Sequence, residues 1–225
     1  MPRILSTKKL QQNHRQYLLN AGLAVVEADF ISIRHKSFQA DTINANLIFT
    51  STNAFKSFLQ NEVSTSLKAH NIFCVGIKTR EFIEQNGYNV IASADYATEL
   101  SAILIEVYKN ESFTFFSGSM RRDTLPGALT KAGVNFNEIE VYDTILSPHS
   151  ITAPVDGILF FSPSGVESYL QKNKITDQAC FCIGTTTAEA VALTPGKIVL
   201  ANKPTVENVI IQCINFYKDD IQNKQ

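Results

Sequence analysis

The sequence predicts an α/β protein in which short apolar strands alternate with amphipathic helices and form parallel sheets. Apolar runs that end abruptly at Ser, Thr or Gly are each followed by a helix-like pattern, most clearly between Gly157 and Val191. The same pattern occurs earlier in the chain, from Asn46 and again from Phe73. This alternation is typical of parallel sheets that are covered by helices.

In the first half of the chain, strands are expected at residues 3–6, 23–26, 47–50, 72–75 and 88–91. A helix is expected after each of them except the second. Leu10, Tyr17 and Leu18 form the expected apolar face of the first helix, and Gly22 ends that helix in a left-handed conformation. The first strand of the second half is expected at residues 113–116.

Residue types at turns and strand ends recur at a fixed separation, which indicates an internal repeat. The separation is first 111 positions and then, after a three-residue deletion, 108. The matched pairs are Ser6 with Ser117, Gly22 with Gly133, Glu27 with Glu138, Ser51 with Ser162, Gly76 with Gly184, Thr79 with Thr187, and Glu99 with Glu207.

The repeat contains one helix-free extended segment in each copy, at Glu27–Phe38 and Glu138–His149. We interpret these as paired strands that connect two domains. One domain then comprises residues 1–30 plus 150–225, the other residues 39–138, and the connector strands are 31–38 and 139–149. Each domain has five predicted strands, the number in a flavodoxin-like sheet. A simple split near residue 112 is the alternative.

Composition excludes several classes of protein. The 225 residues are 44% hydrophobic and 18% charged, with a net charge of −1 and no basic run, so we expect no nucleic-acid partner. No apolar stretch is long enough for a signal peptide or a membrane span, so we expect a cytoplasmic protein. Cys74, Cys180 and Cys182 lie in apolar runs, as expected of reduced core thiols.

Cofactor motifs are absent from the sequence. There is no CxxC, the four histidines are scattered, and neither glycine-rich nucleotide motif occurs, so we expect no metal and no nucleotide cofactor. The strand-end serines have no accompanying histidine, which disfavours a Ser–His–Asp set.

Hydroxyl-bearing residues and glycines follow the predicted strands of both domains. Because the carboxyl ends of parallel strands share one edge of a sheet, these residues should line two edges that could face each other across a cleft. Helix N-terminal N–H groups at such an edge suit carboxylate ligands. Helix capping alone would also explain each Ser or Thr. The residues are Ser6, Ser51, Ser117 and Ser162, with Gly76 and Gly184.

Three further side chains are candidates. Arg121 and Arg122 lie before a predicted helix, where an anionic ligand could compensate their charge, although either could simply face water. Tyr142, in the second connector, could donate a proton to a leaving hydroxyl or could pack as an ordinary aromatic.

Several motifs, in this order, resemble the uroporphyrinogen-III synthase family across nearly the whole chain. They are IFTS at 48–51, VGIKT at 75–79, Gly118-x-x-Arg121-Arg122-x-x-Leu125-Pro126, EVYDT at 140–144, FFSPSG at 160–165, IGTTTA at 183–188 and Lys203-Pro204-Thr205. Two positions depart from the family pattern: Arg80 stands where Ala is common, and Thr52 where Pro is frequent.

The resemblance implies two flavodoxin-like domains joined by a two-stranded connector, and a cyclising lyase that needs no cofactor. Its substrate would be hydroxymethylbilane, a linear tetrapyrrole polycarboxylate, closed with loss of water and inversion of ring D in haem biosynthesis. We expect a monomer. The alternatives are a non-catalytic module that senses a tetrapyrrole or another polyanion, and a two-domain sugar-transferring enzyme.

By the same resemblance, Tyr142 matches the tyrosine thought to assist departure of the hydroxyl. Polar residues that match the family cleft are Thr79, Ser162, Thr186 and Thr187, while Ser51, Gly118, Ser164 and Gly184 would bind substrate through backbone groups. Arg121 and Arg122 complete the expected substrate-binding set.

Overall fold

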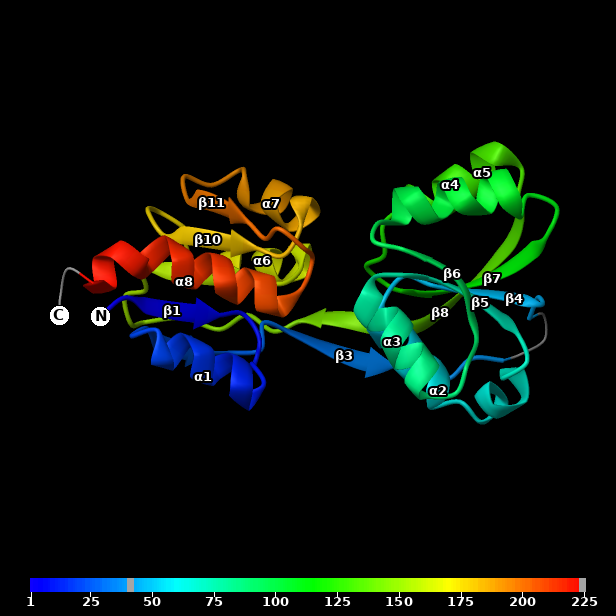
Figure 1. Ribbon diagram of the computed structural model, residues 1–225, viewed down its shortest axis with the longest axis horizontal. Coiled ribbons are helices and arrows are strands. Elements are labelled where there is room, and N and C mark those ends of the chain that lie inside the picture. The colour runs from blue at the N-terminus through cyan, green and yellow to red at the C-terminus, as the bar shows by residue number, and fades with distance from the viewer. Residues whose placement is uncertain (40–42, 223–225) are drawn as a thin grey trace. The chain divides into compact units, whose positions relative to one another are not determined.

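The structure is a computed structural model that describes residues 1–39 and 43–222. It divides into two compact units, shown in Figure 1: unit 1 is Met1–Ser32 with Ile145–Gln225, and unit 2 is Ile33–Thr144. The division is discontinuous in sequence and does not fall near residue 112. Residues 40–42 and 223–225, which the predicted domains include, lie outside the described residues.

Unit 1 contains a five-stranded sheet with the order β11-β10-β9-β1-β2, and its four pairings are parallel. The strands are β1 (Arg3–Ser6), β2 (Ala24–Glu27), β9 (Gly157–Phe160), β10 (Ala179–Cys182) and β11 (Lys197–Leu200). The helices are α1 (Gln12–Asn20), α6 (Pro163–Leu170), α7 (Thr185–Val191) and α8 (Val206–Gln222).

Successive residues of the unit 1 strands pack into opposite cores. Ile4 joins the core formed with α1 and α8, whereas Leu5 joins the core formed with α6 and α7. Every residue of β9 and β10 is buried, because helices cover both faces of the sheet. These continuous apolar runs are the sequence signal that predicts a parallel sheet.

Unit 2 contains a six-stranded sheet with the order β3-β8-β7-β4-β5-β6. The strands are β3 (Ile31–His35), β4 (Asn46–Phe49), β5 (Asn71–Val75), β6 (Val90–Ala94), β7 (Ser112–Gly118) and β8 (Asn135–Leu146). The helices are α2 (Thr52–Leu59), α3 (Ile77–Gln85), α4 (Ala97–Val107) and α5 (Thr124–Ala132), with a 3₁₀ segment at Glu62–Leu67.

Unit 2 also has a core on each face of its sheet. One, with α2 and α3, is rich in aromatic rings, and Phe49 stacks on Phe116 at 5.1 Å between centroids. The other packs Leu100 and Leu104 of α4 and Leu125 and Leu129 of α5 against the strands.

The strand order confirms the internal repeat. When strands are matched by the offsets of 111 and 108 positions, β7, β8, β4, β5 and β6 of unit 2 correspond to β1, β2, β9, β10 and β11 of unit 1. The two sheets then have the same order. Each unit therefore combines the start of one copy with the end of the other.

Three expectations are wrong in detail. The sheet of unit 2 has six strands rather than five, because β3 is hydrogen-bonded beside β8. Of the apolar face expected for the first helix, only Leu18 is buried in α1, because Leu10 precedes the helix and Tyr17 is 59% exposed. The strand expected at residues 88–91 lies at Val90–Ala94, and Tyr88 instead packs in the core and donates its hydroxyl to the carbonyl of Ser64 at 2.8 Å.

All four cysteines are free and buried, which agrees with the expectation for Cys74, Cys180 and Cys182. Within residues 1–39 and 43–222, no helix is both long and apolar enough to cross a membrane. The same residues contain no cluster of three His, Cys, Asp or Glu side chains that could hold a metal ion.

Candidate active site

Tyr142 lies over Gly118 because the pairing of their strands shifts by one residue. Ser117 pairs with Glu140, but the next residue, Gly118, pairs with Tyr142, so Val141 is the extra residue of β8. A shift of this kind re-aims the side chain that follows it. A Cβ at position 118 would lie 2.2 Å from Cζ of Tyr142, so only glycine fits beneath the ring.

Ser51 holds the hydroxyl end of the same tyrosine. Its Oγ lies 3.2 Å from the phenol oxygen of Tyr142 and accepts a hydrogen bond from the backbone N–H of Ala54 at 3.1 Å. Ser51 is thus the N-cap of α2 as well as the partner of the tyrosine. Burial raises the pKa of Tyr142 above its usual value, and the hydrogen bond with Ser51 opposes that rise.

Thr79 lies near this pair, in the first turn of α3. It is 5% exposed, and its hydroxyl oxygen lies 3.3 Å from that of Thr52. The turn before α3 depends on Gly76, which has φ +89°. Thr52 and Arg80 are the two residues that depart from the family pattern. Thr52 contacts Thr79, and Arg80 forms an ion pair with Glu84 at 2.9 Å.

Arg121 is held by carboxylates of the protein itself. Its Nε and Nη2 donate to the two oxygens of Glu138 at 2.8 and 2.9 Å, and its Nη1 donates to Asp123 at 2.9 Å. The charge before α5 therefore has compensation without a ligand. Arg122 is an exposed residue of the same loop.

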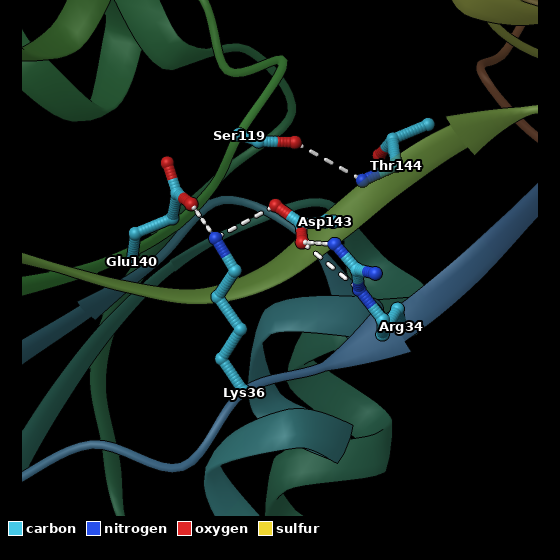
Figure 2. Close-up of polar contacts among 6 residues, drawn as sticks. All are labelled: Arg34, Lys36, Ser119, Glu140, Asp143 and Thr144. Carbon is cyan, nitrogen blue, oxygen red and sulfur yellow. Dashed lines mark hydrogen bonds and ion pairs between the residues drawn. The ribbon is translucent and has the colours of Figure 1, made fainter.

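A second group of charges lies at the end of β3 and on β8. Its β8 members, Glu140 and Asp143, flank Tyr142 in sequence. Figure 2 shows Lys36 between Glu140 and Asp143, with Arg34 donating to Asp143 through Nε and Nη2 at 3.1 and 2.6 Å. The bonds from Lys36 and Arg34 lower the pKa of Asp143. The two cations and two anions balance, so this group has no net charge.

An open hollow of about 410 Å³ lies beside these charges. Its walls are formed by Gly118, Ser119, Arg121, Glu138 and Glu140. The hydroxyl of Ser119 accepts from the backbone N–H of Thr144 at 3.1 Å, which ties the loop after β7 to β8 (Figure 2). The hollow thus lies at the carboxyl end of β7, where ligands of such sheets bind.

In unit 1, Ser162 and Ser164 lie at the start of α6. Ser162 caps the helix by accepting from the N–H of Gly165 at 3.0 Å, and the hydroxyls of the two serines are also 3.0 Å apart. A Cβ on Gly165 would approach Ser162 Oγ at 3.3 Å. The hydroxyl of Thr7, at the end of β1, donates to the carbonyl of Leu159.

Gly184, Thr186 and Thr187 lie at the start of α7. Gly184 is extended, with φ −164°, and no atom lies within 4 Å of the place where its Cβ would be. Neither conformation nor crowding therefore requires glycine there. Thr187 is 1% exposed, while Thr186 is half-buried.

The structure brings Ser51, Gly118 and Tyr142 into contact and places Thr79 in the neighbouring helix. Arg121 borders the hollow, and the five unit 1 residues form two helix starts on neighbouring strands β9 and β10. Sequence reasoning missed Glu138 and Asp143 as partners of cations. The sequence signal that could have identified Glu138 is its match with Glu27 in the internal repeat.

These features define a class: an internally repeated α/β protein with two doubly covered sheets and hydroxyl-lined strand ends. Residues 13–211 match the sequence model of the family described as uroporphyrinogen-III synthase HemD. The chain belongs to the uroporphyrinogen-III synthase family, whose members are cyclising lyases of tetrapyrrole biosynthesis. No curated protein matches the chain in sequence.

Solved structures with the same fold include family members. The uroporphyrinogen-III synthetase of Helicobacter pylori is 17% identical, with a TM-score of 0.72 over 96% of this chain and 100% of that chain. A mutant uroporphyrinogen III synthase of the extreme thermophile Thermus thermophilus is 12% identical, with a TM-score of 0.65 over the whole of both chains. At these identities the likeness concerns the fold.

Proposed function

We propose that the protein closes hydroxymethylbilane to uroporphyrinogen III, with inversion of ring D and release of water. Membership of the family is the observation that carries this proposal. The unit 2 site adds a chemical argument, because it presents a protonated phenol, that of Tyr142, at the carboxyl edge of a parallel sheet.

In the proposed reaction, the phenol of Tyr142 donates to the hydroxyl oxygen on ring A while the C–O bond breaks and water leaves. The substituted α-carbon of ring D attacks the resulting cation, and the new C–C bond gives a spiro intermediate. The bond between ring D and the methylene of ring C then breaks, and that methylene bonds to the free α-carbon of ring D, which inverts the ring. The proton that this carbon loses returns to the phenolate. The sum is loss of one water. Because burial raises the phenol pKa, the proton is present at neutral pH and is readily taken back.

The binding residues that we propose lie around the strand ends and helix starts of both units. The hydroxyls of Thr79, Ser162, Thr186 and Thr187 would hold carboxylates. Backbone groups would do the same at Ser51, Gly118, Ser164 and Gly184. Arg121 would bind substrate only by sharing its guanidinium with Glu138. Arg122 would supply a further cation from the same loop.

The finer architecture is proposed on similar grounds. Unit 1 has the strand order 2-1-3-4-5 when its own strands are numbered along the chain, which supports a flavodoxin-like fold. The chain passes between units inside β3 and β8, which supports connector strands at 31–38 and 139–149. We propose domains of 1–30 plus 150–225 and of 39–138, and a cytoplasmic monomer.

A coupled assay tests the function. Hydroxymethylbilane is generated in place, the protein is added, and the oxidised porphyrin products are separated by isomer. Mostly type III product is expected. Only type I, the product of spontaneous closure, would contradict the proposal and leave a binding module.

A further inference from the structure

We propose that Ser51 is a positioning residue for Tyr142, whose hydroxyl donates to the phenol oxygen and so leaves the phenol proton for the substrate. The inference rests on the proposed function, because it gives Tyr142 the role of proton donor. It also changes the expectation for Ser51, from substrate binding through the backbone to orientation of another side chain.

The direction of the hydrogen bond follows from the surroundings of Ser51. Its Oγ accepts from the N–H of Ala54 at the start of α2. The positive end of the helix favours the orientation in which the O–H proton of Ser51 points away from the helix. The phenol oxygen of Tyr142 lies 3.2 Å from Ser51 Oγ and therefore accepts the hydrogen bond from this proton. An oxygen that accepts from N–H is also a better donor.

The ring is fixed at its other end by the backbone. The one-residue shift at Val141 turns Tyr142 over Gly118, where no side chain intervenes. Tyr142 is thus held at two points: Gly118 lies beneath the ring and Ser51 contacts the oxygen. A donor held in this way has little freedom to leave the reactive orientation.

Helix capping alone does not explain the contact, as the internal repeat shows. Ser162, the repeat partner of Ser51, caps α6 by the same bond, yet its hydroxyl neighbour is Ser164. The residue 111 positions before Tyr142 is Ile31. The cap is therefore common to both units, whereas the phenol contact belongs to unit 2.

The test compares Ser51→Ala with Ser51→Thr, which keeps a hydroxyl, and measures the phenol pKa of Tyr142 directly. Tyrosine labelled with ¹³C at Cζ is titrated by NMR, and the Tyr142 signal is assigned by its absence in Tyr142→Phe. We expect Ser51→Ala to raise the Tyr142 pKa and to lower kcat about tenfold with little change in KM. Ser51→Thr should restore both values.

The double variant Ser51→Ala/Tyr142→Phe separates positioning from capping. We expect no further loss of kcat beyond that of Tyr142→Phe, because Ser51 acts through the phenol. An unchanged Tyr142 pKa in Ser51→Ala, or the same fold-loss in both backgrounds, would overturn the proposal. If Ser51→Ala does not fold, Ser51→Gly serves instead, since glycine is a tolerated N-cap.

The titration also keeps this inference distinct from the proposed function. It requires no substrate, so the hydrogen bond is tested even if the protein forms no type III product. A shifted pKa with no catalysis would contradict the proposed function alone. Full catalysis by Tyr142→Phe would overturn the catalytic half of the inference.

Discussion

Glu27 and Glu138, which the repeat pairs, hold equivalent loops in the two units. Glu27 accepts from the backbone N–H of Leu10 at 2.7 Å, and Glu138 accepts from the guanidinium of Arg121, the residue 111 positions after Leu10. In both units the glutamate on the second strand of the repeat fixes the loop after the first. The carboxylate of Glu138 therefore holds the loop after β7 in place, although Glu138 also lines the hollow.

Glu138→Gln should lower stability near pH 7 by about 1 kcal/mol, and the loss should vanish in acid. Burial would raise the pKa of Glu138, but the bonds from Arg121 outweigh it and the pKa is lowered from 4.5. Its contribution is thus present above pH 4.5 and disappears as pH falls through the lower folded-state value.

Denaturant unfolding of both proteins from pH 7 to about pH 3 checks this dependence. Glu84→Gln is the matched control, because Glu84 forms an exposed helical ion pair with Arg80. A Glu138→Gln difference that stayed constant with pH would rule out the carboxylate as its source.

Tyr142→Phe should lower kcat by about 10²-fold while the product remains type III. The ring stays over Gly118, so the shape of the site persists and only the proton donor is lost. Tyr88→Phe is the control: it removes another buried hydroxyl, at a cost of about 1 kcal/mol, without a change in kcat. An unaltered rate in Tyr142→Phe would assign the tyrosine to packing.

Gly118→Ala should cost about 1–3 kcal/mol and lower kcat, because the new Cβ displaces the ring and separates Tyr142 from Ser51. In a Tyr142→Ala background the ring is absent, so the same change should cost much less stability. Thermal unfolding of the four proteins of this cycle gives the coupling. An equal loss of stability from Gly118→Ala in the two backgrounds would show that the Tyr142 ring is not the reason for glycine at position 118.

Gly184→Ala should fold with unchanged stability, because φ is extended and the position of the Cβ is empty. A rise in KM would then report a substrate that approaches the backbone at the start of α7. Steady-state kinetics with hydroxymethylbilane measures it. An unchanged KM would remove Gly184 from the binding site.

The buried thiols should not react in the folded protein. Burial raises the pKa of Cys74, Cys180 and Cys182 to about 12. It also raises the pKa of Cys213 above the usual range of a thiol. Titration with a chromogenic disulfide should therefore detect no thiol in native protein and four in denaturant. Rapid reaction of any one without denaturant would contradict the buried placement.

The sequence predicts the covered strands well and the site only in part. The observed ends of β1 are those that the sequence predicts, because strands buried on both faces are continuous apolar runs. Local periodicity carries no information on the register shift at Val141, which brings Tyr142 to Ser51 and Gly118. Likewise, Glu138, which holds Arg121, lies 17 positions away on β8, a pairing that only tertiary structure reveals.

The interleaved strands of unit 1 also impose an order of events during synthesis. Residues 33–144 are contiguous, so unit 2 can fold as soon as they leave the ribosome. β1 must wait for β9, and the bond from Arg3 to Asp156 spans 153 positions. At typical translation speeds this wait lasts about ten seconds. β1 can pair with β2 early, but its other edge stays unpaired until β9 has been made, which is through most of the synthesis of the chain.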